Sequence, residues 1–287
     1  MERATDPLPV FVVGVPRSGT TWVQRMLVEH PDAWPLVETY MFSRQIGLGA
    51  LLRSAGRARD ADQLAEAPAG LGRLFSRPEL VDEVRVIARR WLRRGSDPDA
   101  RFVVEKSPWH LRDLDVIAEV LPEARYVHVV RDGRDVAVSL IAARRTWSRE
   151  GPDRAMDVVR EAAVLWADGI DRGRVASAQL GDRLLEIRYE EIHADPHAAS
   201  ARLFRHAGMP HDDELVARAV RTTDFERIPE PKGEDRALRA GRVGDWRARF
   251  GMSAAIAFER RAGEVLRETG YESDPRWWLR RPVRSRL

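Results

Sequence analysis

The sequence contains no cysteine. It can therefore form no disulfide, no zinc–thiolate site and no thiol nucleophile. It also has no apolar stretch approaching the ~18 residues of a membrane span, and its first residues, MERATDPLP, contain no apolar signal core. From these absences we expect neither export nor a membrane-spanning segment, and we predict a cytoplasmic location.

A large excess of one charge is missing as well. Lys and Arg total 48 against 45 Asp and Glu, for a net charge of only +3. This balance predicts no nucleic-acid partner. The length of 287 residues and the hydrophobic content of 44% suffice for a sizeable core, either as one large domain or as a domain with an inserted lobe.

Residues 10–27, VFVVGVPRSGTTWVQRML, pass from an apolar run through a glycine-bounded loop into a helical pattern. Gly14 and Gly19 bracket four residues, the spacing of a loop whose backbone N–H groups hold an anion at a helix N-terminus. A triphosphate-binding loop of this type has lysine after the second glycine, but here that position is Thr20 and the cation is Arg17. We therefore interpret the loop as a site for a 5′-phosphate group that carries no triphosphate. The alternative, an ordinary strand-to-helix turn, is less favoured.

Short β-rich runs alternate with helical patterns along the chain, which predicts an α/β fold with a P-loop-like central parallel β-sheet flanked by helices on both faces. Residues 40–95 show no strand pattern and predict a helical insertion, which could form an acceptor lid. The predicted strands are 10–13, 33–37 (expected to be buried), 101–105, 124–130 and 184–188. The predicted helices are 20–29, 78–94, 111–121, 135–145, 153–170, 196–207, 212–221 and 253–269.

Two features of these helical regions carry further expectations. In the helix 78–94, Leu80, Val84, Ile87 and Trp91 predict one face that packs on the core. The tail 276–287 combines a tryptophan pair with arginines. An interfacial membrane contact or an acidic partner is one interpretation of this tail, and packing of the tryptophan pair on the domain is the preferred one.

Chemically distinctive residues follow the predicted strands. Because ligands of parallel sheets collect beyond the carboxyl ends of the strands, these residues should share one site. We expect two anion pockets in it, one at 17–21 and one at Arg131 and Ser139, where a helix start and a guanidinium can hold a phosphate. The residues just past strand ends are Gly14, Glu38, Lys106, Arg131 and Tyr189.

Three blocks resemble the sulfotransferases that use 3′-phosphoadenosine 5′-phosphosulfate (PAPS): PRSGTTW at 16–22, VVRDGRDVAVS at 129–139 and RAGRVGDW at 239–246. The resemblance implies a single sulfotransferase domain over 1–287. It implies that Arg131 and Ser139 hold the 3′-phosphate. The positions matching the 5′-phosphosulfate loop are Arg17, Ser18, Gly19, Thr20 and Thr21.

The same resemblance implies further nucleotide contacts. Tyr189 lies near the nucleotide, Thr223 and Phe225 surround the adenine, and Trp22 could stack on it; each of these aromatics could instead be a core residue. In the late block the family's lysine is replaced by Ala240. The 3′-phosphate would then rely on Arg239, Gly241 and Arg242.

The expected catalytic residues depend on two positions at which this sequence differs from part of the family. Cytosolic small-molecule members carry lysine in the first loop and a catalytic histidine two residues after the later lysine, where this chain has Arg17 and Pro108. The pattern is closer to the branch that includes tyrosylprotein sulfotransferases, which implies Glu38 as base and Lys106 as its assistant. His110 is the alternative base, and Glu38 could instead be a surface or capping carboxylate.

Sulfuryl transfer in line from a phosphate oxygen to a hydroxyl or amine needs positioning and charge neutralisation. Arg17 and Lys106 would neutralise the leaving oxygens and Glu38 would accept the acceptor's proton. This scheme requires no metal ion. The acceptor is expected to be a small molecule, a carbohydrate or a lipid, with a peptide tyrosine also open. The rival interpretations are a kinase-like enzyme that uses ATP and magnesium and a non-catalytic nucleotide-binding interaction protein.

Overall fold

The structure is a computed structural model and describes residues 6–57, 74–147, 154–224 and 242–280. Its centre is a parallel sheet of five strands in the order β2-β3-β1-β4-β5. The predicted central parallel sheet is therefore confirmed, and β1 lies in its middle. The strands are β1 Leu8–Gly14, β2 Ala33–Val37, β3 Phe102–Lys106, β4 Arg125–Val130 and β5 Leu184–Arg188.

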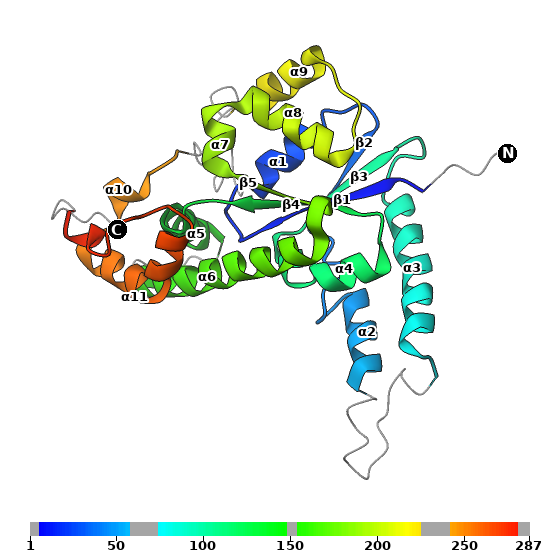
Figure 1. Ribbon diagram of the computed structural model, residues 1–287, viewed down its shortest axis with the longest axis horizontal. Coiled ribbons are helices and arrows are strands. Elements are labelled where there is room, and N and C mark those ends of the chain that lie inside the picture. Colours follow the sequence, from blue (N-terminus) through cyan, green and yellow to red (C-terminus); the bar gives the residue numbers. More distant parts are fainter. Residues whose placement is uncertain (1–5, 58–73, 148–153, 225–241, 281–287) are drawn as a thin grey trace, which may run out of the picture.

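Helices cover both faces of the sheet, with α1, α7, α8 and α9 on one side and α4 and α6 on the other (Figure 1). In the described ranges no helix is both long and apolar enough to cross a membrane. The helices are α1 Thr20–Leu27, α2 Leu48–Arg57, α3 Arg77–Arg94, α4 Leu114–Val120, α5 Gly133–Trp147, α6 Ala155–Leu180, α7 Tyr189–Ala194, α8 Pro196–Ala207, α9 Asp213–Thr223, α10 Trp246–Arg249 and α11 Met252–Glu268, with short 3-10 turns η3 Pro108–Arg112, η5 Gly181–Arg183 and η7 Trp277–Arg280.

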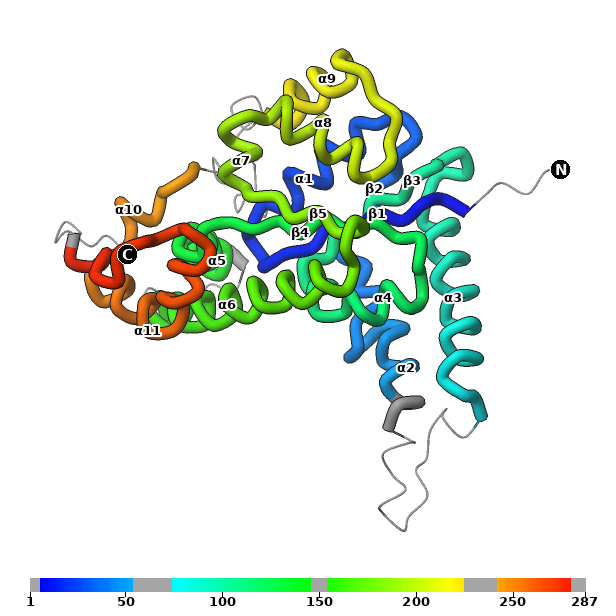
Figure 2. The backbone as a smooth tube through the Cα atoms, viewed as in Figure 1, coloured from blue at the N-terminus to red at the C-terminus, as the bar shows by residue number. Residues whose placement is uncertain are grey.

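Strand β1 contributes side chains to two hydrophobic cores because successive side chains of a strand point to opposite faces. Phe11 and Val13 pack in the core formed with α2, α3 and α4, whereas Val10 and Val12 pack in the core under α1, α8 and α9. A third core lies between α5, α6 and α11. The C-terminal helix α11 runs beside α6 at one end of the molecule (Figure 2), which brings the last part of the chain close to the start of α5.

The expectation that 33–37 is buried is wrong. β2 is an edge strand with only β3 beside it, and its side chains Trp34 and Val37 are 40% and 62% exposed. Pro35 within this strand was the available signal, because proline has no N–H to donate and is found in sheets mainly on edge strands. As a result, Glu38 follows the open edge of the sheet.

Three helices differ in detail from the prediction. The buried face of α3 includes Ala88 and Leu92, while Trp91 is 46% exposed, so the apolar face is rotated from the one expected. α6 continues to Leu180, well past the predicted end at residue 170. α11 begins at Met252, with Gly251 as its N-cap, one residue before the predicted start at 253. α2 and α3 lie in the predicted helical insertion, of which residues 58–73 are outside the described residues.

Candidate active site

The glycine-bounded loop between β1 and α1 opens into a cavity of about 270 Å³ at the carboxyl ends of the strands. Gly19 is the N-cap of α1 at φ 102°, and a Cβ there would lie 2.4 Å from the Tyr189 ring. The loop is thus pressed against that ring, with Gly19, Thr20 and Thr21 lining the cavity. This geometry presents the start of α1 to an anion.

Two arginines meet at the loop. Arg17 donates from Nε to Ser139 Oγ (3.1 Å), and Arg131 donates from Nη1 to the Arg17 carbonyl (3.2 Å). Burial lowers the pKa of the Arg17 guanidinium, and the positive charge of Arg131 lowers it further. The Arg131 Nε is buried and has no hydrogen-bond partner within the described part of the chain. The predicted pockets at 17–21 and at Arg131 and Ser139 therefore adjoin in one cavity, whose wall also includes Asp135 and Asp245.

Glu38 and Lys106 form an ion pair at the other side of the cavity, with Oε1 and Nζ 2.6 Å apart. The Glu38 N–H also donates to the Lys106 carbonyl (2.8 Å), which continues the pairing of β2 with β3. The Lys106 side chain is buried while that of Glu38 is largely open to the cavity. A carboxylate and an ammonium group are thus held as a unit beside the loop.

Backbone strain is concentrated here. In the described ranges the residues other than glycine with positive φ are Arg17 (78°), Glu38 (48°) and Tyr40 (50°), and all three line the cavity. Such conformations cost roughly 1–3 kcal/mol each and gather at functional sites. The Tyr40 hydroxyl donates to Glu38 Oε2 (3.3 Å), and burial together with the Glu38 charge raises the pKa of the Tyr40 phenol.

A buried carboxylate supports the strained segment from behind. Glu105 Oε1 accepts the N–H (3.2 Å) and the hydroxyl (2.9 Å) of Thr39 and the hydroxyl of Ser107 (2.5 Å). Glu105 Oε2 faces His110 Nδ1 (3.1 Å). Burial by itself would raise the pKa of Glu105, but the hydrogen bonds from His110, Ser107 and Thr39 outweigh it and lower the pKa. As alternation along β3 requires, Glu105 and Lys106 point opposite ways.

His110 lies within this support and not in the cavity. Its side chain is fully buried, and its Nε2 accepts the N–H of Phe42 (3.3 Å). Neither ring nitrogen is therefore open to an acceptor hydroxyl, and the geometry disfavours His110 as the base. Among the described residues no cluster of three metal-ligating side chains is present.

The other residues expected to bind the nucleotide have varied positions. Trp22 lines the cavity and packs edge-on against Tyr189 and His193. It is therefore part of the cavity wall and also part of the hydrophobic core. Burial raises the pKa of Tyr189 to about 12. Ser18 is buried in the loop, and Thr223 ends α9 with its hydroxyl donating to the Ala219 carbonyl; neither lines the cavity. Arg242 does, and Phe225, Arg239 and Gly241 lie outside the described residues.

Sequence reasoning missed several parts of the wall. Tyr40 and Trp109 line the side near the ion pair, and Asp135 and Asp245 line the side near Arg131. Each lies within four residues of a residue that was predicted, so sequence proximity to the strand ends was the available signal. The sequence does not show which residues of a loop after a strand point into the cavity. These four residues could therefore not be told apart from neighbours that point elsewhere.

A parallel α/β sheet with an anion loop after its central strand defines the class of P-loop-like folds. The family model described as "Sulfotransferase family" matches residues 9–213. The chain belongs to the sulfotransferase family.

Individual relatives are distant. Protein-tyrosine sulfotransferase 1 of Danio rerio is 26% identical over 217 residues, 73% of this chain and 57% of that protein. The chain thus spans little more than half the length of this relative. Nodulation protein NoeE of Sinorhizobium fredii is 26% identical over 299 residues, 95% of this chain and 68% of that protein. The crystal structure of mouse sulfotransferase SULT7A1 complexed with PAP shares the fold, with a TM-score of 0.58 at 18% identity over 96% of this chain and 88% of that one.

Proposed function

We propose that the protein transfers a sulfuryl group from PAPS to a hydroxyl or amine of an acceptor. The observation that carries this proposal is that the partly buried Arg17 and the buried Arg131 lie beside the Glu38–Lys106 ion pair in one cavity. A ligand with two separated anionic groups would match the charges of Arg17 and Arg131. The Glu38–Lys106 pair would supply an acid and a base to a reacting group in the same cavity. Membership of the sulfotransferase family supports this choice of donor.

The nucleotide would lie along the carboxyl ends of β1 and β4. The loop at Arg17, Thr20 and Thr21 would hold the 5′-phosphosulfate, while Arg131 and Ser139 would hold the 3′-phosphate. Arg131 suits this role because it lines the cavity with a positive charge. The remaining proposed contacts are Ser18, Gly19, Trp22, Tyr189, Thr223, Phe225, Arg239, Gly241 and Arg242.

In the reaction, the acceptor oxygen or nitrogen forms a bond to sulfur as the bond from sulfur to the bridging phosphate oxygen breaks. Glu38 takes the acceptor's proton. Arg17 and Lys106 neutralise the charge that develops on the sulfuryl and bridging oxygens. The ion pair with Lys106 holds the Glu38 carboxylate beside the cavity before the acceptor binds.

The acceptor would enter over Tyr40 and Trp109, whose rings line the cavity beside the ion pair. Aromatic walls of this kind accept a flat ring or the apolar face of a sugar. A small molecule, a carbohydrate or a lipid hydroxyl fits this description, and residues 40–95 would contribute the lid. The names of two relatives point to protein tyrosine and to nodulation as contexts for such acceptors.

Calorimetric titration tests the nucleotide assignment. We expect 3′-phosphoadenosine 5′-phosphate to bind the wild type more tightly than ATP with magnesium, and Arg131→Ala to lose most of that affinity. Arg174→Ala, which removes an exposed arginine paired with Glu268, is the matched control and should bind like the wild type. Equal or tighter binding of ATP with magnesium, unaffected by Arg131→Ala, would replace this proposal by a kinase-like function.

The catalytic roles are tested separately. Glu38→Gln should lower kcat with PAPS by about 10²–10⁴-fold, the usual contribution of a general base, with little change in affinity for 3′-phosphoadenosine 5′-phosphate. Lys106→Met should lower kcat comparably. Retention of kcat in Glu38→Gln together with normal nucleotide binding would assign the proton transfer to another group.

A further inference from the structure

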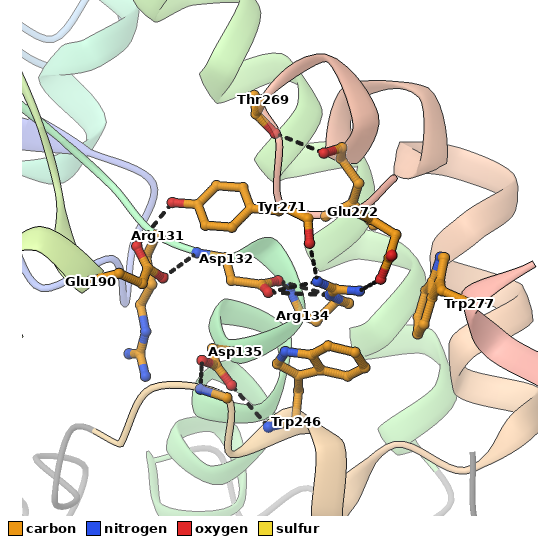
Figure 3. A network of polar contacts seen from close by, with 12 residues as sticks. Arg131, Asp132, Arg134, Asp135, Glu190, Trp246, Thr269, Tyr271, Glu272 and Trp277 are labelled. Atoms are coloured by element: carbon orange, nitrogen blue, oxygen red, sulfur yellow. Dashed lines mark hydrogen bonds and ion pairs between the residues drawn. The ribbon is translucent and has the colours of Figure 1, made fainter. Parts of the chain in front are cut away.

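The second arginine of the RDGR turn, Arg134, is 1% exposed and fully neutralised. Its guanidinium makes a bidentate contact with Asp132 (Nε–Oδ1 3.0 Å, Nη2–Oδ2 2.8 Å) and an ion pair with Glu272 (3.0 Å). It also contacts two mutually perpendicular indole rings, 3.7 Å from the centroid of Trp246 and 4.8 Å from that of Trp277 (Figure 3). A guanidinium enclosed in this way has no face left for a ligand, in contrast to Arg131.

What Arg134 contacts is informative. Asp132 belongs to its own turn, but Trp246 begins α10, and Glu272 and Trp277 follow α11. Arg134 Nη2 also donates to the Tyr271 carbonyl (2.8 Å). One buried side chain therefore joins the turn after β4 to two segments from the last part of the chain.

The next residue, Asp135, holds the same late segment by its backbone. Its carboxylate accepts the N–H of Gly244 at Oδ2 (2.7 Å) and the N–H of Trp246 at Oδ1 (2.8 Å). Arg131 adds a third contact, donating from Nη2 to the Arg242 carbonyl (3.2 Å). Three side chains within residues 131–135, which join β4 to α5, thus contact residues 242–246 through the backbone and the Trp246 ring.

The fixed segment borders the cavity, because Arg242 and Asp245 line it together with Arg131 and Asp135. Any shift of the segment away from Arg131 would break the stack on Arg134 and both hydrogen bonds to Asp135. Arg134 does not line the cavity itself, so it would act on a ligand through its neighbours, this segment among them.

We infer that Arg134 and Asp135 are positioning residues that hold the segment 242–246 against Arg131 and thereby set the preference for a 3′-phosphate on the bound nucleotide. The inference rests on the proposed function, because it concerns the 3′ end of the same ligand. Preorganisation of the segment makes its donors available without an ordering cost upon binding. We call the contacts of Arg134 and Asp135 with the segment 242–246 the clamp. Loss of the clamp should weaken binding of the 3′-phosphate and leave binding of the 5′-phosphate unchanged.

The test compares two ligands that differ only at that position, 3′-phosphoadenosine 5′-phosphate and adenosine 5′-phosphate, by calorimetric titration. Asp135→Asn is nearly isosteric but replaces one acceptor by a donor facing a backbone N–H. We expect it to reduce the ratio of the two affinities by about tenfold, as expected for loss of an interaction near 1.4 kcal/mol, while the affinity for adenosine 5′-phosphate changes by less than about threefold. Arg134→Lys, which keeps the charge but loses the planar fork, should act in the same direction.

Two further variants keep the test decisive. Trp277→Phe removes one of the two indoles that contact Arg134, and Trp277 does not line the cavity. A reduced ratio of the two affinities in this variant supports the clamp even if Asp135→Asn fails to fold. Asp113→Asn, a matched change at another buried aspartate that does not line the cavity, should leave the ratio unchanged.

The inference is overturned if both affinities fall equally in Asp135→Asn and Trp277→Phe, because this is the result of a merely structural role. It is also overturned if the ratio is that of the wild type. If the wild type itself shows no preference for the 3′-phosphorylated ligand, the proposed function fails instead, and this outcome is visible before any variant is measured.

Discussion

Replacing Glu105 by glutamine perturbs the hydrogen bonds behind the cavity wall without changing their geometry. The Phe42 N–H donates to His110 Nε2, so the ring proton is on Nδ1, which donates to Glu105 Oε2. The other carboxylate oxygen accepts from Thr39 and Ser107. A glutamine has one acceptor oxygen, and in either orientation its NH₂ group meets an N–H donor; a change of tautomer would only move the conflict to the Phe42 N–H.

One such buried mismatch should cost about 1–3 kcal/mol of the free energy of unfolding. A loss near 2 kcal/mol corresponds to a fall in Tm of roughly 3–4 °C for a chain of 287 residues. The pH dependence has a definite sign. Because the folded-state pKa of Glu105 lies below its ordinary value of 4.5, its stabilisation is present above that pH and is lost as the pH falls through the folded pKa. The difference between Glu105→Gln and the wild type should therefore shrink below about pH 4.5.

Urea unfolding of both proteins at pH 7 and at several values below pH 4.5 measures this difference directly. Glu119→Gln is the control, because Glu119 forms a partly exposed ion pair with Arg77 (2.5 Å), which should be worth less than about 1 kcal/mol. Equal stabilities of Glu105→Gln and the wild type at pH 7, or a difference that grows on acidification, would refute the reasoning. Because Thr39 lies between Glu38 and Tyr40, Glu105→Gln should also lower kcat.

Two glycines give further predictions. Gly173→Ala would place a Cβ 2.2 Å from the His128 imidazole and should cost about 1–3 kcal/mol of unfolding free energy; unchanged thermal unfolding would show that the ring moves freely. Gly19→Ala combines a φ of 102° with a Cβ 2.4 Å from the Tyr189 ring, so it should displace the loop and lower affinity for 3′-phosphoadenosine 5′-phosphate by at least about tenfold, as calorimetry would measure; wild-type affinity would contradict the close packing.

The elements that the sequence predicted well are those with local signals. The run ARYVHVV predicted β4, and the glycine spacing predicted the loop before α1. The end of α6 was predicted at residue 170, whereas the helix continues to Leu180, and Gly169 and Gly173 inside it allow close packing on Val15 and His128. Contacts of that kind depend on residues far away in the sequence.

The site shows the same division. The rule that ligands gather at the carboxyl ends of parallel strands was enough to place Glu38, Lys106 and Arg131 in one site, and all three line the cavity. The sequence could not distinguish His110 from Glu38 as a base, because burial of the histidine depends on Glu105 beneath it. Residues that act through packing, such as Arg134, carry no signal of their own in the sequence.

The buried contact between Arg134 and Glu272 also has a consequence for synthesis of the chain. The two residues are 138 positions apart, so at 5–20 residues per second a ribosome needs roughly 7–28 s to pass from one to the other. During that interval Arg134 has its neighbour Asp132 as a partner but lacks Glu272 and both indole rings. The first strands, loop and helices can assemble while translation continues, but the clamp on the second anion pocket closes only when the final segment has emerged.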